Sequence, residues 1–294
     1  MSSKSDEDEV CACCGIAAVD DVKLEECNDG CDLVKYCSDK CCGNHREEPK
    51  AELRDKDLFA QPDGSHLGEC PICFLPLSLD ITKSSFHSCC CKLVCNGCIY
   101  ADKISSGKNN CPFCREPTVN GEEENIKRVM KRVKVNDPAA LNYMGRRRYQ
   151  EGDYDKAAKY WTDAVKLGDR RSFYHLGILY YDGHGVKKDL EKAIHHWEEA
   201  AIGGHPFARH NVAHYEEKNG NIERAVKHFI IAANLGYEES MKVLWKYYSA
   251  GGITKEELEA TLRTHKAAID ETKSAQRDAA EVLYAYRQHF SSSN

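Results

Sequence analysis

The cysteines constrain this chain most, because all of them lie in its first part. The 294 residues include 17 cysteines, which lie between residues 11 and 114, and residues 115–294 contain none. Such clustering indicates either a disulfide framework or metal sites. Residues 1–10 are polar and acidic and lack the apolar core of a secretory signal, so we expect a reducing compartment, where thiols persist as metal ligands. Metal sites in a cytoplasmic protein are therefore the expectation.

Length and charge narrow the class of protein further. A chain of 294 residues is too long for one core of ordinary size and predicts more than one domain. The formal net charge of −6 argues against nucleic acid as the main partner. No apolar run is long enough to span a membrane, so we expect no membrane partner. Basic stretches at residues 127–134 and 146–148 are interpreted as solvated helix faces, with a nuclear localisation signal as the alternative.

The second cysteine cluster has the spacing of a double zinc site. Cys70-x2-Cys73 is followed after fifteen residues by a triplet that begins at Cys89, and the pairs Cys95-x2-Cys98 and Cys111-x2-Cys114 follow. Zinc takes four tetrahedral ligands, and a C-x2-C turn points two thiolates inward. Four such pairs predict two complete sites and two Zn²⁺ ions.

This cluster resembles the RING family, in which the four ligand pairs interleave. The resemblance implies one zinc site made of the first and third pairs and another made of the second and fourth. The implied ligands are Cys70, Cys73, Cys95 and Cys98 for the first, and Cys89, Cys90, Cys111 and Cys114 for the second. The sequence departs from the family pattern at the triplet, where a RING commonly has Cys-x-His. Cys91 is an alternative for either triplet ligand, and His87 is a further one.

RING domains dock a ubiquitin-conjugating enzyme and hold its charged thioester in a reactive pose. The family uses an aliphatic residue between the first two cysteines, a proline after the seventh ligand and a basic residue after the last. Ile72, Pro112 and Arg115 occupy these places here. The aromatic residue that often completes the docking groove is missing, and Ile104 is the nearest apolar candidate.

The first cysteine cluster resembles a partial MYND finger, a protein-interaction module with two zincs. Its pattern is Cys11-x2-Cys14, Cys27-x3-Cys31, Tyr36-Cys-Ser-x2-Cys41 and then His45. The resemblance implies one site of Cys11, Cys14, Cys37 and Cys41, and another that contains Cys27, Cys31 and His45. The final cysteine of the second site is absent. That site is either incomplete, completed by Cys42, or closed by water, so this finger would hold one or two Zn²⁺.

A repeat dominates the sequence beyond residue 137. Three stretches align in register, with spacings of 36 and 32 residues between the glycines that close them. The aligned positions are Ala157, Ala193 and Ala225; Trp161, Trp197 and Phe229; Ala164, Ala200 and Ala232; and Gly168, Gly204 and Gly236. Each copy predicts two helices that pack through the alanines and end at a glycine with positive φ. The aromatic is expected to fill the gap to the next pair.

This pattern resembles the Sel1-like repeat, a relative of the tetratricopeptide repeat, over residues 137–252. Leu176-Gly177, Gly183-His-Gly185 and Lys192-Ala193 carry the resemblance most specifically. It implies a helical solenoid that binds proteins and has no catalytic chemistry of its own. Five histidines of this region are interpreted as ordinary helix residues rather than metal ligands; they are His195, His196, His205, His210 and His214.

The predicted architecture is multidomain, with two small zinc-stabilised α+β fingers followed by an all-α solenoid. The expected order is an acidic tail (1–10), a partial MYND-like finger (11–49), a linker (50–69), a RING (70–117), a connecting helix (118–136), the repeats (137–252) and a C-terminal helical region (253–294). Two functions compete. One is a RING-type ubiquitin-protein transferase that binds a conjugating enzyme and a protein substrate. The other is a non-catalytic scaffold.

Overall fold

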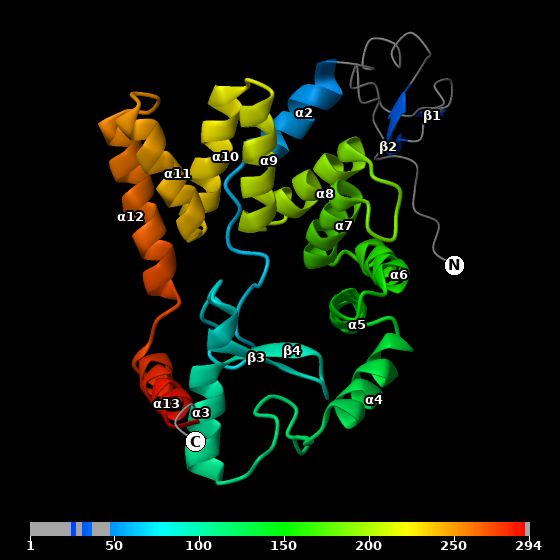
Figure 1. Ribbon diagram of the computed structural model, residues 1–294, viewed down its shortest axis with the longest axis vertical. Coiled ribbons are helices and arrows are strands. Elements are labelled where there is room, and N and C mark those ends of the chain that lie inside the picture. Colours follow the sequence, from blue (N-terminus) through cyan, green and yellow to red (C-terminus); the bar gives the residue numbers. More distant parts are fainter. Residues whose placement is uncertain (1–24, 28–30, 37–47, 292–294) are drawn as a thin grey trace, which may run out of the picture. The chain divides into compact units, whose positions relative to one another are not determined.

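The computed structural model describes residues 25–27, 31–36 and 48–291, and the side chains of residues 54–283. The chain divides into two compact units, residues 1–60 and 61–294. In the first unit, strands β1 (Glu25–Cys27) and β2 (Cys31–Tyr36) pair antiparallel, and helix α2 (Glu48–Phe59) follows (Figure 1). None of the helices that the structure describes is long and apolar enough to cross a membrane.

The second unit begins with a small α+β module that contains the second cysteine cluster. A short 3-10 helix, η2 (Ile81–Lys83), leads into strand β3 (Ser84–His87), which pairs antiparallel with β4 (Lys92–Cys95). Helix α3 (Asn96–Ser106) follows directly. The cysteine at the end of β4 is therefore also the N-cap of α3, where the Cys95 sulfur accepts a hydrogen bond from the Cys98 amide at 3.4 Å.

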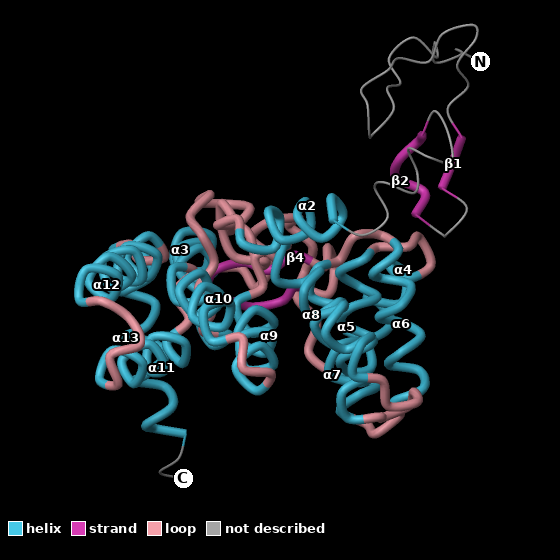
Figure 2. The backbone as a smooth tube through the Cα atoms, turned by 90° about the horizontal axis from the view of Figure 1, so that it is seen from above, coloured by secondary structure: helices cyan, strands magenta, loops and turns pink. Residues whose placement is uncertain are grey.

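Ten helices follow in the rest of the described chain. They are α4 (Glu122–Val133), α5 (Pro138–Gln150), α6 (Tyr154–Lys166), α7 (Arg170–Asp182), α8 (Leu190–Ile202), α9 (Pro206–Lys218), α10 (Ile222–Asn234), α11 (Glu238–Ser249), α12 (Lys255–Glu271) and α13 (Ala275–Ser291). Figure 2 shows them as successive helices joined by short loops. The all-α solenoid predicted for this region is confirmed.

A sixteen-residue period of turn residues explains why α5, α6 and α7 have equal lengths. Helices α5, α6 and α7 start after Asp137, Asp153 and Asp169, and each aspartate side chain accepts hydrogen bonds from amides of the first helical turn. Such capping stabilises a helix by about 1 kcal/mol. The residue before a cap is often a glycine with positive φ. The three glycines predicted to close the copies follow this rule, with φ of 80° at Gly168, 78° at Gly204 and 87° at Gly236.

Each repeat is held together by an aromatic ring seated on a small residue. A Cβ atom at Gly145 of α5 would lie 2.4 Å from Trp161 Nε1, and one at Gly177 of α7 would lie 2.3 Å from the Trp197 ring. Both indoles donate a hydrogen bond to the carbonyl three residues before that glycine, at 3.3 Å. The aromatic therefore packs first within its own helix pair, and not only against the next pair as the sequence suggested.

The tryptophan ring of the first repeat also contacts the next repeat. The Trp161 indole stacks on His175 of α7, with ring centroids 4.6 Å apart. In the third repeat the smaller Phe229 packs with Ala213, the residue equivalent to the two glycines. Glycine under tryptophan and alanine under phenylalanine are thus two solutions with similar total volume.

This size relation yields a test of repeat packing. Gly177→Ala should destabilise the chain by roughly 1–3 kcal/mol, because the new methyl group overlaps the Trp197 ring. Trp197→Phe should also destabilise it, through a cavity and a lost hydrogen bond. The double variant recreates the alanine–phenylalanine pair and should be more stable than the sum of the single effects by about 1 kcal/mol. Urea unfolding followed by circular dichroism measures all three.

The control for this cycle is Gly64→Ala, since nothing lies within 4 Å of a Cβ atom there. It should leave the urea midpoint unchanged. Strict additivity of the two single effects would contradict the proposed seat of Trp197 on Gly177.

Candidate metal centre

Two matching turns present half of the cysteines. In the first, the Cys70 carbonyl accepts from the Phe74 amide at 2.9 Å and the Cys70 amide donates to Leu75 at 3.0 Å. In the second, the Cys111 carbonyl accepts from Arg115 at 2.9 Å and its amide donates to Glu116 at 2.7 Å. Each turn is closed by an isolated β-bridge. We call these turns knuckle 1 (residues 70–76) and knuckle 2 (residues 111–117).

The two knuckles also match in sequence and backbone. Both read Cys-Pro-x-Cys-x-x-Pro. The residue after the second cysteine has positive φ in both, 57° at Phe74 and 65° at Arg115. This conformation is uncommon for residues other than glycine and lets the chain reverse tightly around a pair of sulfurs.

The structure brings the first and third cysteine pairs together. The sulfurs of Cys70, Cys73, Cys95 and Cys98 lie within 4.8 Å of one another, and we call them cluster 1. The Cys70–Cys98 sulfur distance is 3.9 Å and the Cys73–Cys95 distance is 3.8 Å. Knuckle 1 supplies one pair of sulfurs, and the junction of β4 with α3 supplies the other.

The second and fourth pairs also converge. The sulfurs of Cys89, Cys90, Cys111 and Cys114 lie within 4.8 Å of one another, and we call them cluster 2. The Cys90–Cys111 sulfur distance is 3.9 Å and the Cys89–Cys114 distance is 3.3 Å. Knuckle 2 supplies one pair, and the turn between β3 and β4 supplies the other. The two clusters interleave along the chain.

The geometry of both clusters fits a tetrahedral metal ion. Zn–S bonds of about 2.3 Å place tetrahedral sulfurs about 3.8 Å apart, which matches three of the four distances. All nine cysteines between residues 70 and 114 are free, so none of these contacts is a disulfide. Four cysteines leave no open coordination position, which is typical of a structural rather than a catalytic zinc site.

The proton balance of cluster 1 also favours a cation. The hydrogen bond from Cys95 lowers the pKa of Cys70 to about 4, and the same contact together with burial raises the pKa of Cys95. Burial raises the pKa of Cys98 to about 12. Without a metal the cluster therefore stabilises a thiolate at Cys70 while Cys95 and Cys98 stay protonated. A divalent cation would supply the charge needed to deprotonate them.

The third cysteine of the triplet has a different environment. Cys91 is buried, has φ of 55°, and packs with Val129 of α4 and with Ala140 and Met144 of α5. The other alternative ligand, His87, has its carbonyl in the β3–β4 turn, where it accepts from the Cys91 amide at 2.7 Å. Neither side chain belongs to the group of sulfurs in cluster 2. Cys91 thus acts as a small apolar side chain that attaches the module to α4 and α5.

The expected ligands of the first cysteine pattern lie largely outside the described residues. The residues outside the described ranges are Cys11, Cys14, Cys37, Cys41 and His45, together with the alternative ligand Cys42. Of the proposed set, only the backbone of Cys27 and Cys31 is described, and these two residues face each other at the turn of the β1–β2 pair.

The three expected docking residues differ in accessibility. The Ile72 side chain is 36% exposed in knuckle 1. Pro112 of knuckle 2 is buried, whereas its neighbour Phe113, which sequence analysis did not single out, is 43% exposed. Arg115 is exposed and forms an ion pair with Asp102 of α3. Phe113 holds the same place in its knuckle as Ile72, and the Cys-Pro-x-Cys repeat was the signal that could have found it.

Comparison with known proteins identifies the repeats. The Sel1 repeat family matches residues 138–169, 174–205 and 207–237, about a third of the chain. These matches coincide with the helix pairs α5–α6, α7–α8 and α9–α10. Residues 138–237 therefore carry three Sel1 repeats, as the sequence predicted. The fourth pair, α11–α12, has no match to the family model.

Curated relatives are similar over short segments only. A protein named putative beta-lactamase HcpC from Helicobacter pylori strain J99 is 43% identical over 56 residues, which is 19% of either chain. The rat DAP3-binding cell death enhancer 1 is 42% identical over 55 residues, 18% of this chain and 11% of that protein. The chain thus spans a fifth or less of the length of these relatives.

Two solved structures show similar helical repeats. A Sel1 repeat protein from Oxalobacter formigenes is 24% identical, with a TM-score of 0.45, over 65% of this chain and 76% of that one. A protective antigen of uropathogenic Escherichia coli with an SLR fold is 24% identical, with a TM-score of 0.42, over 51% of this chain and 33% of that one.

The contrast between Cys90 and Cys91 gives a sharp test of the metal ligands. We expect Cys90→Ser to remove one equivalent of bound zinc, since its sulfur lies in cluster 2. Cys91→Ser should retain the same zinc content as wild type, because Cys91 packs among apolar side chains. Inductively coupled plasma mass spectrometry of the purified variants measures the content. Equal zinc loss in both variants, or loss in Cys91→Ser alone, would contradict the assignment.

Zinc affinity should depend steeply on pH. The raised pKa values of Cys95 and Cys98 mean that both thiols are protonated at neutral pH without metal, so binding must displace at least two protons. Proton release makes binding weaker as pH falls, by at least about 100-fold per pH unit. Competition with a chromophoric chelator between pH 6 and 8 measures the slope. A slope below tenfold per unit would show that these thiols are not ligands.

Proposed function

We propose that residues 70–114 form a RING-type module with one Zn²⁺ in each cluster, and that the chain is a ubiquitin ligase. In this proposal the module docks a ubiquitin-conjugating enzyme while the Sel1 repeats hold a protein substrate. The zinc ions would fix the loops and take no part in the reaction. No covalent intermediate forms on this chain, because a RING accelerates transfer by holding the two reactants in a productive geometry.

The pair of exposed apolar side chains on the knuckles carries the proposal. Ile72 and Phe113 stand between the two cysteines of their knuckles and remain accessible, although other apolar groups of the module, such as Val94, are fully buried. Exposed apolar side chains at matching places of a small module are typical of a protein-binding surface. An aliphatic and an aromatic contact there suit the docking of a conjugating enzyme.

The repeats offer a separate surface for the substrate. A groove of about 430 Å³ lies along α7, α8 and α9, and its lining includes Tyr181, Leu190, Trp197 and Tyr215. Tyr181 and Leu190 are both more than two-fifths exposed. Aromatic residues of this kind provide much of the binding energy in protein interfaces. The MYND-like finger would add a further contact for a partner peptide, with one or two zincs, in a cytoplasmic setting.

A non-catalytic scaffold is the second candidate, and one observation favours it. The Arg115 guanidinium, which would bridge the conjugating enzyme and ubiquitin, is paired with Asp102 of its own module. Pro112 is also buried, so Ile72 alone of the three expected docking residues is both exposed and without an ion-pair partner in its own module. The architecture of repeats and clusters would then serve only to join proteins.

Autoubiquitination of the zinc-loaded chain with a panel of conjugating enzymes separates the two functions. We expect activity in wild type, and a loss of at least tenfold in Ile72→Ala and in Phe113→Ala, because each removes an exposed apolar contact. Ile81→Ala is the matched control, since Ile81 is exposed in η2 outside the knuckles. Zinc content is measured in every variant.

Two outcomes of this assay would change the conclusion. Activity that survives both substitutions keeps the ligase and removes the assigned surface. Absence of activity with every enzyme, in protein that holds its zinc, favours the scaffold. Asp102→Asn tests the role of Arg115 directly: release of the guanidinium should raise activity, and a fall as large as that of Arg115→Ala would make the ion pair structural.

A further inference from the structure

The C-terminal helix α13 lies against helix α3 of the cysteine module, although the two are far apart in sequence (Figure 1). Gly97 of α3 makes this approach possible. A Cβ atom at Gly97 would lie 2.8 Å from Arg277 Cγ and 3.0 Å from Arg277 Cα, so any larger residue would displace the backbone of α13. The Gln276 side chain donates to the Gly97 carbonyl at 2.8 Å and fixes the register.

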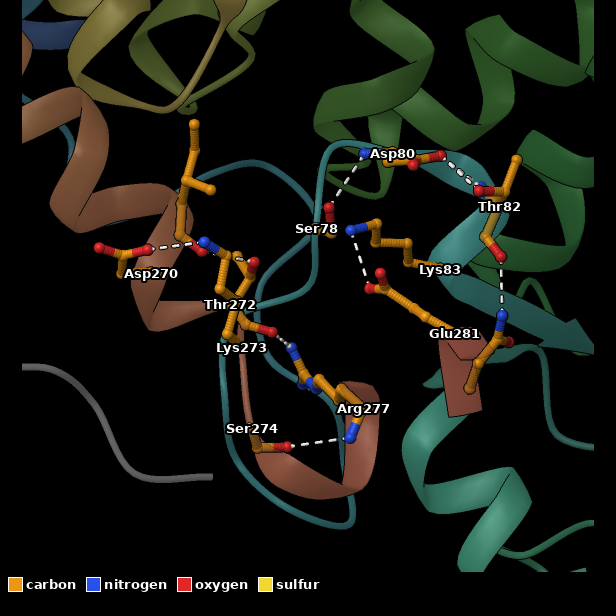
Figure 3. A network of polar contacts seen from close by, with 12 residues as sticks. Ser78, Asp80, Thr82, Lys83, Asp270, Thr272, Lys273, Ser274, Arg277 and Glu281 are labelled. Carbon is orange, nitrogen blue, oxygen red and sulfur yellow. Dashed lines mark hydrogen bonds and ion pairs between the residues drawn. The ribbon is translucent and has the colours of Figure 1, made fainter. Parts of the chain in front are cut away.

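Arg277 connects this helix to knuckle 1. Its Nη1 donates to the carbonyls of Pro76 and Thr272, both at 2.6 Å, and its Nη2 donates to the Leu75 carbonyl at 3.1 Å. The same Nη2 also donates to the Cys73 sulfur at 3.4 Å. Arg277 is only 8% exposed. Figure 3 shows the guanidinium beside the Thr272 carbonyl, at the start of α13.

A peripheral ion pair adds little to this contact. The Lys83 Nζ atom lies 2.8 Å from Oε1 of Glu281 on α13, but both side chains are more than a third exposed (Figure 3). Exposed pairs of this kind stabilise a protein weakly. The docking of α13 therefore depends mainly on the close approach at Gly97 and on the buried guanidinium, and Gln276 adds one neutral hydrogen bond.

The buried charge of Arg277 requires a compensating negative charge. Burying a cation costs several kcal/mol unless a well-placed partner offsets it. Three of its four acceptors are neutral carbonyls, and the fourth is a sulfur of cluster 1. Four thiolates around Zn²⁺ carry a net charge of about −2, and hydrogen bonds from the surrounding protein to such sulfurs stabilise the centre. Arg277 is placed to supply one of these bonds.

We propose that Arg277 is an outer-sphere positioning residue of cluster 1, and that α13 stays docked only while this cluster holds its metal. The proposal rests on the proposed zinc occupancy of cluster 1 and does not depend on ligase activity. Loss of the metal lowers the negative charge of cluster 1 and releases its four sulfurs from a fixed arrangement, so the buried guanidinium loses its fixed partner and α13 leaves the module. The C-terminal helix thus reports the metal state of one cluster.

The test compares Arg277→Ala, Arg277→Lys and the matched control Gln276→Ala in the full chain. Gln276 holds α13 on Gly97 but touches no sulfur. Zinc release to a chromophoric chelator should show one of the two module ions leaving at least tenfold faster in Arg277→Ala, with the other unchanged. Arg277→Lys keeps the charge without the fork and should release that ion at an intermediate rate. Gln276→Ala should release it within threefold of wild type.

A second measurement distinguishes an effect of Arg277 on the metal–sulfur bonds from simple structural support of α13. In Co²⁺-substituted protein, the sulfur-to-metal charge-transfer band of one site should shift in Arg277→Ala and stay in place in Gln276→Ala. Hydrogen exchange of residues 275–283 should rise to the level of an unpaired helix when the metal is stripped from wild type.

Defined results overturn the proposal. Release of both ions from Arg277→Ala at wild-type rates, or an α13 that stays protected after metal removal, contradicts the role of Arg277. Wild-type protein that holds no zinc in residues 70–114 would instead refute the proposed function, so the two failures are distinguishable. Should Arg277→Ala fail to fold, Gly97→Ala replaces it, since the added methyl group displaces the guanidinium from cluster 1 without removing a ligand.

Discussion

The convergence of eight cysteine sulfurs in two groups is the constraint on which residues 70–117 depend. Apart from cysteines, the buried core between the knuckles and α3 consists of Leu77 and Val94. So small a core does not hold a chain of this length in one conformation without cross-links or metal. Because each cluster joins two distant segments, closing both fixes β3, β4 and α3 at once. The surfaces used by α4, α5 and α13 exist only after that closure.

The repeats are stabilised by helix capping and by packing between neighbouring helices rather than by metal sites. Helices α5, α6 and α7 begin at capping aspartates, and most repeat helices end near a glycine with positive φ, so their bounds are set locally. Neighbouring helices then lock through an aromatic ring over a small residue, and contacts extend only to the next helices in the series. The two regions meet at a few specific points, such as the stacked rings of Phe86 and Tyr143, with centroids 4.8 Å apart. Loss of metal should therefore leave the repeats folded.

These differences explain what the sequence could and could not predict. The repeat glycines and the helical solenoid could be predicted because they follow from short sequence patterns that recur in each repeat. The spacing of the C-x2-C turns predicted two four-cysteine sites, and their interleaved pairing came from the resemblance to the RING family. The environment of Cys91 could not be predicted, because the sequence does not distinguish three adjacent cysteines and only the packing of α4 and α5 does so. The role proposed for Arg277 had no signal in the sequence, because three of its four acceptors lie about two hundred residues earlier.

The contacts of the module bear directly on how a ligase of this kind would work. Cys91 and Phe86 attach it to α4 and α5, while Arg277 attaches it to α13, so it is held at two sides. The linker adds a third attachment, because the His66 amide donates to the Gly204 carbonyl at 2.9 Å in the turn before α9. Ile72 and Phe113 stay exposed despite these contacts. A docking surface fixed in this way relative to the repeats favours transfer by positioning, since little freedom is lost when enzyme and substrate bind.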